Sequence, residues 1–85
     1  MKLSVVIPAH NEANYIAKTL QSIQEQNFKE YEVIVVTNGC TDETEKVVKN
    51  QDLPLNLYSL PKANVSRARN FGAGKAQGEL LLFLD

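Results

Sequence analysis

The sequence has little of several features that would point to a particular class of protein. It holds a single cysteine, Cys40, so no internal disulfide is possible. Its formal net charge is −1, which gives no basis for nucleic acid or another polyanion as a partner. No segment approaches the ~18–20 apolar residues of a membrane span. The stretch before Pro8 is too short for the apolar core of a signal peptide, so we expect a cytoplasmic protein.

Glycine-rich phosphate-binding loops are also absent. The segment after the first predicted strand reads PAHNEAN, which matches neither G-x-G-x-x-G nor the P-loop pattern. This argues against an NAD site and a Walker-type site. A nucleotidyltransferase-like sugar-nucleotide enzyme is also a weaker hypothesis for the function, because such enzymes use a glycine-rich loop at this place. A catalytic thiol at Cys40 is disfavoured, because His10 is its only candidate base.

Two hydrophobic periods alternate along the chain. Short apolar runs rich in β-branched residues predict strands, and amphipathic stretches between them predict helices. With 44% hydrophobic and 22% charged residues, the chain has the composition of a globular α/β domain. The alternation indicates parallel strands joined by right-handed helical crossovers. The predicted strands are residues 3–7, 31–37, 55–60 and 79–85, and the predicted helices are 11–26, 41–50 and 66–77.

The expected architecture is a βαβαβαβ Rossmann-like parallel sheet with strand order 3-2-1-4. The third strand suits an edge, because Pro54 and Asn56 fit poorly in a sheet centre. The first two helices should then cover one face and the third helix the other. Gly72 and Gly74 predict a close approach of that third helix to the sheet, and Gly78 is placed as its C-terminal cap.

The last predicted strand, LLLFLD, has the apolar composition of a strand in the middle of a sheet, but it is expected at the edge. Residues 80–84 are all large and apolar, yet the expected order leaves one side of this strand unpaired. Exposed apolar edges pair with other chains. Two expectations follow. Either residues 1–85 are the incomplete first part of a larger domain, or they form a non-catalytic module that self-associates through residues 80–84 as a homo-oligomer.

Polar residues follow the predicted strands at the ends where open α/β sheets bind ligands. Simpler explanations exist for some of them. Asn11 can cap the first helix, Glu12 can favour its positive end, and Thr41 or Asp42 can cap the second. Asn38 and Gly39 can be explained by their preference for turns alone, without a ligand. The candidate residues at this rim are Pro8, Ala9, His10, Asn11, Glu12, Asn38, Gly39 and Asp85.

Two charged features hint at a ligand. Arg67 and Arg69 begin the third predicted helix, where each cation costs up to ~0.3–1 kcal/mol against the helix dipole. That cost suggests an anion nearby, although solvation of both side chains is the simpler alternative. Asp85 follows the last strand and is a candidate oxygen ligand for Mg²⁺ or Mn²⁺. One carboxylate alone does not make a metal site.

Three stretches together resemble the start of a family-2 glycosyltransferase with the glycosyltransferase-A fold. They are SVVIPAHNE, VIVVTNGCTDET and SRARNFGAGKAQGELLLFLD. The resemblance covers essentially the whole chain. It implies the half of such a domain that binds a nucleotide-diphosphate sugar of the UDP or GDP type. The complete enzyme would transfer that sugar to an acceptor.

The resemblance also implies roles for single residues. The loop Pro8 to Glu12 lines the nucleobase and ribose in such enzymes, with an acid at the place of Glu12. The position of Asn38 is usually an aspartate that contacts the base, so V-T-N-G-C in place of V-D-D-G-S leaves the preferred base open. Arg69 falls where the family has a basic residue near the nucleotide.

Asp85 would open the family's D-x-D motif and lie near the ribose and metal. Mg²⁺ or Mn²⁺ is therefore expected in the complete enzyme, where it would neutralise the leaving diphosphate. Residues 1–85 alone are not expected to hold the metal stably. They are expected to contain no catalytic residue, because the acceptor half and the catalytic base of the family lie in other parts of the enzyme. We therefore expect weak nucleotide binding without turnover, and a parent enzyme that can work at the inner face of the membrane.

Overall fold

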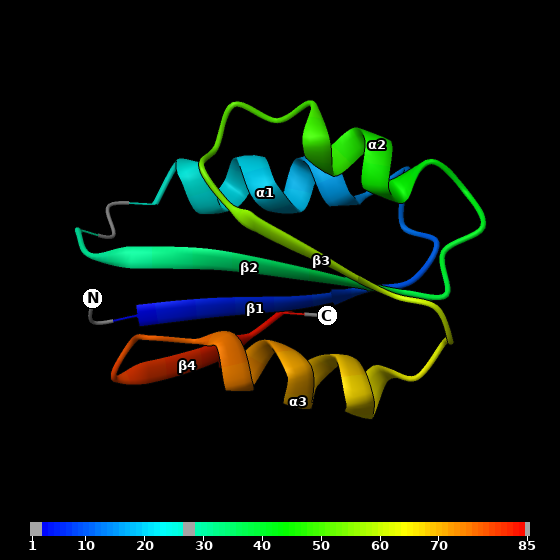
Figure 1. Ribbon diagram of the computed structural model, residues 1–85. Coiled ribbons are helices and arrows are strands. Elements are labelled where there is room, and N and C mark those ends of the chain that lie inside the picture. Colours follow the sequence, from blue (N-terminus) through cyan, green and yellow to red (C-terminus); the bar gives the residue numbers. More distant parts are fainter. Residues whose placement is uncertain (1–2, 27–28, 85) are drawn as a thin grey trace.

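A computed structural model describes residues 3–26 and 29–84 of the chain. They form three layers, with a parallel sheet between helices (Figure 1). The strand order is β3-β2-β1-β4, as predicted. The strands are β1 (Leu3–Ala9), β2 (Tyr31–Asn38), β3 (Asn56–Leu60) and β4 (Leu80–Phe83), and the helices are α1 (Ile16–Gln24), α2 (Thr44–Lys49) and α3 (Val65–Lys75).

The two faces of the sheet carry separate cores. Helices α1 and α2 lie on one face and α3 on the other, which confirms the prediction (Figure 1). Successive side chains of a strand point to opposite faces, so Val5 and Val33 pack under α1 and α2, while Val6 and Ile34 pack under α3. Both central strands are therefore buried on both sides, as their uninterrupted apolar runs indicate.

Helix α3 approaches the sheet closely at one glycine. A Cβ atom on Gly72 would overlap Cγ1 of Val6 and would lie 3.3 Å from Cγ2 of Val36. Gly74 is exposed, and a Cβ there would meet nothing within 4 Å. The predicted close approach is confirmed at Gly72 and wrong at Gly74, because the two residues lie on different sides of the helix.

The helices are shorter than the sequence predicted. Helix α1 begins at Ile16 rather than residue 11, because Asn11 has a positive φ of 51° that a right-handed helix does not allow. The amides of Tyr15 and Ile16 both donate to the Glu12 carbonyl, which makes a turn before the helix. Helix α2 spans only Thr44–Lys49. Helix α3 ends at Lys75 with an extended Ala76, so Gly78 is not its cap.

Pro8 lies inside β1, whereas the sequence predicted that the strand ends there. The Leu84 amide donates to the Val6 carbonyl at 3.0 Å. In a parallel ladder the next donor on β1 would be residue 8, and proline has no N–H. Pro8 therefore supplies no N–H to the ladder between β1 and β4, while the pairing of β1 with β2 continues to Ala9 opposite Thr37.

A buried carboxylate fastens the turn between α3 and β4 to the beginnings of the two central strands, β1 and β2. Glu32 is 9% exposed and is the register partner of Ser4. Its Oε2 accepts hydrogen bonds of 2.6 Å from the Ser4 hydroxyl and from the Gln77 amide, and the Gly78 amide donates to Ser4 Oγ at 2.8 Å. Burial alone would raise the pKa of Glu32, but these hydrogen bonds together hold it below its ordinary value.

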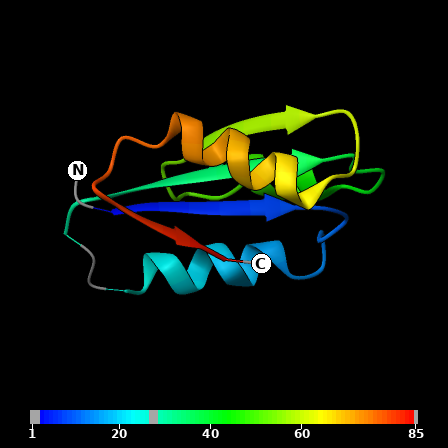
Figure 2. The same ribbon diagram turned by 90° about the horizontal axis from the view of Figure 1, so that it is seen from below.

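Strand β4 is the exposed edge that the sequence predicted. Figure 2 shows α3 crossing the sheet beside β4 rather than over it. The four residues of β4 are all exposed, from 39% at Leu82 to 65% at Leu80. Among the residues that the structure describes, no helix has the length and apolarity to cross a membrane.

Candidate functional site

The carboxyl ends of β1 and β2 meet the start of α3 at one edge of the sheet. We call residues 9–13, 38–44 and 63–64 the carboxyl-edge site. Asn38, at the end of β2, is 3% exposed and lies at its centre. Its Nδ2 donates to the Ala9 carbonyl at 3.0 Å, and its Oδ1 accepts from the Asn64 amide at 3.0 Å. One side chain thus joins three segments that are far apart in the sequence.

His10 lies against the end of β2. Its Nδ1 is 2.7 Å from the Asn38 carbonyl oxygen. A carbonyl only accepts hydrogen bonds, so this contact requires the hydrogen to be on Nδ1. The imidazole is otherwise exposed. In its neutral form, Nε2 is then an acceptor at the rim of the site.

Asn11 holds the loop after β2, not the first helix. Its Oδ1 accepts from the Thr41 amide at 2.8 Å and from the Asp42 amide at 3.2 Å. The residue that precedes α1 is Tyr15, which makes no side-chain capping bond. The alternative that Asn11 caps α1 is therefore wrong. Its left-handed backbone, which asparagine tolerates better than most residues, aims the side chain across to the second loop.

Asp42 connects the same two loops, but its side chain lies in the loop after β2 and binds the loop after β1. Its Oδ2 accepts from the Ala13 amide at 3.2 Å, and its Oδ1 accepts from the amide and hydroxyl of Thr44. The Thr44 hydroxyl in turn accepts from the Glu12 amide at 2.8 Å. The hydrogen bond from Thr44 is the main reason that the pKa of Asp42 is lowered. Asp42, not Thr41, accepts the hydrogen bond from the amide of Thr44, the first residue of α2. Together these bonds hold the two loops as one unit.

Gly39 brings the loop after β2 against the segment before α3. It has a φ of +61°, and a Cβ atom there would lie 2.5 Å from the Ala63 nitrogen. Its amide donates to the Leu60 carbonyl at 2.9 Å. No larger residue fits without moving the backbone of residue 63. The position of Gly39 is therefore set by close packing as well as by turn geometry.

Asn64 joins the site although it is not among the residues predicted from the sequence. Its Oδ1 accepts from the Arg67 amide at 3.0 Å, which caps α3, while its own amide binds Asn38. The signal was available, because asparagine directly before the first residue of a helix, here Val65, is a common N-cap. Helix α3 accordingly begins at Val65, one residue earlier than predicted.

The remaining predicted residues are placed as follows. Pro8 is buried in β1, Glu12 is half-buried in the first loop, and Arg69 is half-buried in the second turn of α3. Asp85, the candidate metal ligand, lies outside the described residues. Within residues 3–26 and 29–84, no three histidine, cysteine or acidic side chains gather as a metal site.

The comparison with protein families assigns the chain. The description "Glycosyl transferase family 2" matches residues 4–85, which is nearly the whole sequence. The strand order β3-β2-β1-β4 agrees with this description. The chain belongs to glycosyltransferase family 2.

Relatives of known function agree with this assignment. The poly(ribitol-phosphate) beta-N-acetylglucosaminyltransferase TarS of Staphylococcus aureus is 35% identical over 91 residues, covering 100% of this chain and 16% of TarS. Its crystal structure superposes with a TM-score of 0.93, and a TarS structure in complex with UDP-GlcNAc gives 0.92, covering 26% of that chain. The whole of this chain therefore matches part of the glycosyltransferase-A fold of TarS.

A more distant solved structure shares the same fold. The Pyrobaculum calidifontis mannosyltransferase PcManGT, in complex with GDP-Man and Mn²⁺, has 31% identity and a TM-score of 0.86 over 94% of this chain and 26% of its own. A Campylobacter jejuni beta-1,3-glucosyltransferase is 36% identical over 93 residues. The chain spans between 12% and 29% of the length of these and similar curated relatives.

Proposed function

We propose that residues 1–85 are the nucleotide-sugar-binding half of a glycosyltransferase-A domain. The parent enzyme would transfer a sugar from a nucleotide-diphosphate donor to an acceptor. The observation that carries the proposal is the carboxyl-edge site, where Asn38, Asn11 and Asp42 join the loops that follow β1 and β2. This is the edge at which open parallel sheets bind ligands. Solved relatives bind UDP-GlcNAc or GDP-Man.

In this proposal the residues at the edge have separate roles. Residues 8–12 line the base and ribose, with His10 and Glu12 as their polar groups. Asn38 and Gly39 form the end of β2 beside the base. Arg69 supplies positive charge near the nucleotide, and its half-buried position in α3 limits where its side chain can reach. Asp85 would contact the ribose and metal.

The metal and the catalytic base belong to the complete enzyme in this proposal. Mg²⁺ or Mn²⁺ would be held mainly by carboxylates beyond the described residues. The presence of Mn²⁺ in the mannosyltransferase structure supports a metal in the complete enzyme. We therefore expect the 85-residue chain to bind nucleotide weakly and to give no turnover of a nucleotide sugar. A cytoplasmic location stays a prediction.

Calorimetric titration with UDP and then GDP, each with and without Mn²⁺, tests the proposal. We expect one nucleotide to bind with a weak affinity that does not depend on Mn²⁺, because the base and ribose contacts lie in the described loops. The substitution Arg69→Gln should weaken that binding about tenfold, since a charged contact to a phosphate contributes about 1.4 kcal/mol or more.

Lys18→Gln is the matched control for charge. Lys18 is exposed on α1 and makes no contact with the carboxyl-edge site among the described interactions, so its loss should leave nucleotide affinity unchanged. Absence of heat with both nucleotides at millimolar concentration would contradict the proposal. Equal weakening by both substitutions would show a general charge effect instead of a site.

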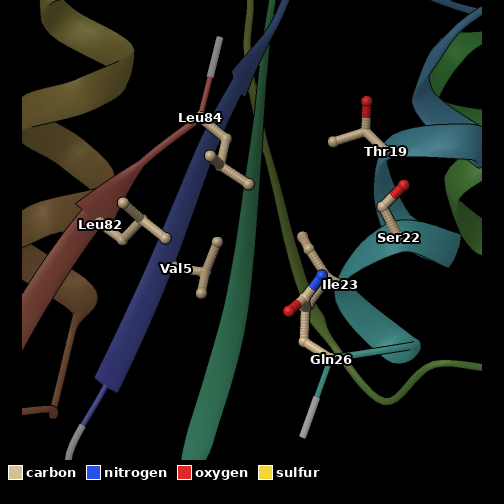
Figure 3. A pocket seen from close by; sticks show the side chains of 7 residues that line it. All are labelled: Val5, Thr19, Ser22, Ile23, Gln26, Leu82 and Leu84. Atoms are coloured by element: carbon tan, nitrogen blue, oxygen red, sulfur yellow. The ribbon is translucent and has the colours of Figure 1, made fainter. Parts of the chain in front are cut away.

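Self-association through β4 is a second candidate, favoured by one observation. Beside the exposed strand lies an apolar groove of about 350 Å³ (Figure 3). Leu82 and Leu84 face it from one side and Ile23 of α1 from the other, with Val5 at its floor. The outer side of β4 has free backbone groups that a second copy could pair with.

Light scattering over a range of protein concentrations tests this candidate. If the chain self-associates, its mass should rise with concentration, and Leu81→Lys should keep it monomeric because a charge on an edge strand opposes pairing. Val65→Lys is the matched control, since Val65 is 47% exposed and Leu81 is 46% exposed, but Val65 lies on α3. A monomeric wild-type chain at the highest concentration would refute self-association.

A further inference from the structure

We propose that Asn38 is a latent modification site, which deamidates when the carboxyl-edge site opens. Asn38 is the only asparagine in the sequence that is followed by glycine. An asparagine–glycine pair is chemically labile, because glycine has no side chain to keep its backbone nitrogen away from the asparagine side chain. This inference concerns the covalent chemistry of the chain, and it does not depend on the proposed function.

The reaction at this pair needs only the chain and water. The backbone nitrogen of Gly39 gives up its proton and attacks Cγ of Asn38. The Cγ–Nδ2 bond breaks, Nδ2 leaves as ammonia, and a five-membered succinimide ring remains. Water then opens this ring at one of its two carbonyl carbons. Opening at Cγ gives aspartate, and opening at the main-chain carbon gives isoaspartate, in which the main chain runs through Cγ.

The folded site holds every group that the reaction needs. The Gly39 amide donates to the Leu60 carbonyl at 2.9 Å, so the attacking nitrogen is engaged. Nδ2 and Oδ1 of Asn38 are bonded to the Ala9 carbonyl and the Asn64 amide, which fixes Cγ. In an extended strand, Cβ and the next nitrogen lie on different sides of the Cα–C bond. Ring closure therefore requires a backbone rotation, which the pairing of Asn38 with Leu60 in the sheet opposes.

The contacts that build the site also place the labile pair at its centre. Gly39 has a φ of +61°, and a Cβ atom there would lie 2.5 Å from the Ala63 nitrogen, so no other residue fits. Asn38 supplies both a donor and an acceptor from one side chain. Deamidation removes the donor to Ala9, and isoaspartate also adds one carbon to the main chain between β2 and its loop. Either product therefore weakens the site that exposed it.

The rate of deamidation should report how often the site is open. Local openings close again much faster than a succinimide forms, so the rate follows the equilibrium population of the open form. Hydrogen exchange at the Gly39 amide requires the same bond to Leu60 to break. The folded state should therefore slow deamidation by at least the factor by which it slows that exchange.

Mass spectrometry of proteolytic fragments, taken over time, measures the conversion of Asn38. The samples are the folded chain, the chain in guanidinium chloride, and a peptide of residues 35–42 as the unfolded reference. The variant Asn11→Gly removes the acceptor of the Thr41 and Asp42 amides but tolerates the positive φ of 51° at this position. Glu32→Gln is the matched control, since it removes a charged hydrogen-bond acceptor at the other end of the strands.

We expect Asn38 to deamidate at least about tenfold more slowly in the folded chain than in the peptide, because three hydrogen bonds must break first. The rate in guanidinium chloride should equal that of the peptide. Asn11→Gly should accelerate deamidation of the folded chain by about threefold or more, because it frees the loop that contains Gly39. Glu32→Gln should have a smaller effect, since its contacts lie away from this loop.

Two results would overturn the inference. One is a rate in the folded chain that is less than about tenfold below the rate of the peptide, which would mean that the site does not protect the pair. The other is an acceleration in Glu32→Gln that equals or exceeds the acceleration in Asn11→Gly, because deamidation would then follow global unfolding. If Asn11→Gly does not fold, the comparison of the folded chain with the peptide and with exchange at the Gly39 amide still decides.

Discussion

Replacing Gly72 with alanine should lower the free energy of unfolding by about 2–3 kcal/mol. The added methyl would overlap Cγ1 of Val6 and press on Cγ2 of Val36, which are side chains of the two central strands. Val6 and Val36 are both fully buried in the core under α3, so neither can turn away into solvent. Overpacking of this kind in a tight core typically costs 1–3 kcal/mol. Urea denaturation followed by circular dichroism measures the change.

Gly74→Ala is the matched control for this experiment, because it makes the same chemical change in the same helix. Gly74 is exposed and a methyl there meets nothing within 4 Å, so the substitution should stabilise the chain by up to about 1 kcal/mol through helix propensity alone. The expected stability changes therefore have opposite signs at two positions within one turn of the same helix. Similar stability changes in both variants would contradict the close packing of α3 on β1 and β2.

The fold was predictable because its signals are local. Each central strand is an uninterrupted apolar run, and each helix has its own amphipathic or capping pattern, so the periods alone give the order of elements. The edge position of β3 followed from Pro54 and Asn56. Strand ends were less predictable. Pro8 was expected to end β1, but its missing N–H affects only the ladder with β4, which depends on the register of another strand.

The site was predictable in its location but not in its connections. Parallel topology places the ends of β1 and β2 at one edge, which gathers the loops that contain His10, Asn11 and Asn38. Which atom each side chain binds depends on segments about 30 residues away, such as Thr41 for Asn11 and Ala9 for Asn38. The sequence shows that these residues are polar, but it does not show that their side chains form hydrogen bonds with distant backbone groups. The sequence alone therefore leaves helix capping open as an alternative for Asn11.

The Glu32 connection was missed for the same reason. Ser4 and Glu32 are polar residues in two strands that read as buried, and only the register makes them partners. Their position on the α3 face, with Gln77 and Gly78, follows from the path of the chain after α3. Paired polar residues at the beginnings of neighbouring parallel strands are the signal that could have found them.

Removal of the Glu32 carboxylate should have the second large effect. Glu32→Ala would leave the buried Ser4 hydroxyl and the part-buried Gln77 amide without their acceptor. Hydrogen bonds to a charged group contribute about 1.5–3 kcal/mol each, so a loss of about 3 kcal/mol is expected at pH 7. Because Gln77 and Gly78 lead directly into β4, amide exchange should increase first in Leu80–Phe83.

The pH dependence of stability separates the charge of Glu32 from its shape. The folded-state pKa of Glu32 is lowered, so its carboxylate stabilises the fold above the ordinary value near 4.5, and this contribution is lost as the pH falls from there through the lowered value. Glu32→Gln keeps the shape and an acceptor oxygen but cannot titrate. It should therefore cost about 1 kcal/mol at pH 7 and lose less stability than the wild type between pH 6 and pH 3.

The acid sensitivity should decrease in Glu32→Gln without disappearing. Glu45 also has a lowered pKa, because the hydroxyls of Ser59 and Thr37 donate to its Oε2, and it still titrates in the variant. Glu79→Gln is the control, since Glu79 is exposed, and its curve should follow that of the wild type. If Glu32→Gln and Glu79→Gln gave the same dependence of unfolding free energy on pH, the charge of Glu32 would not be what fastens the turn between α3 and β4.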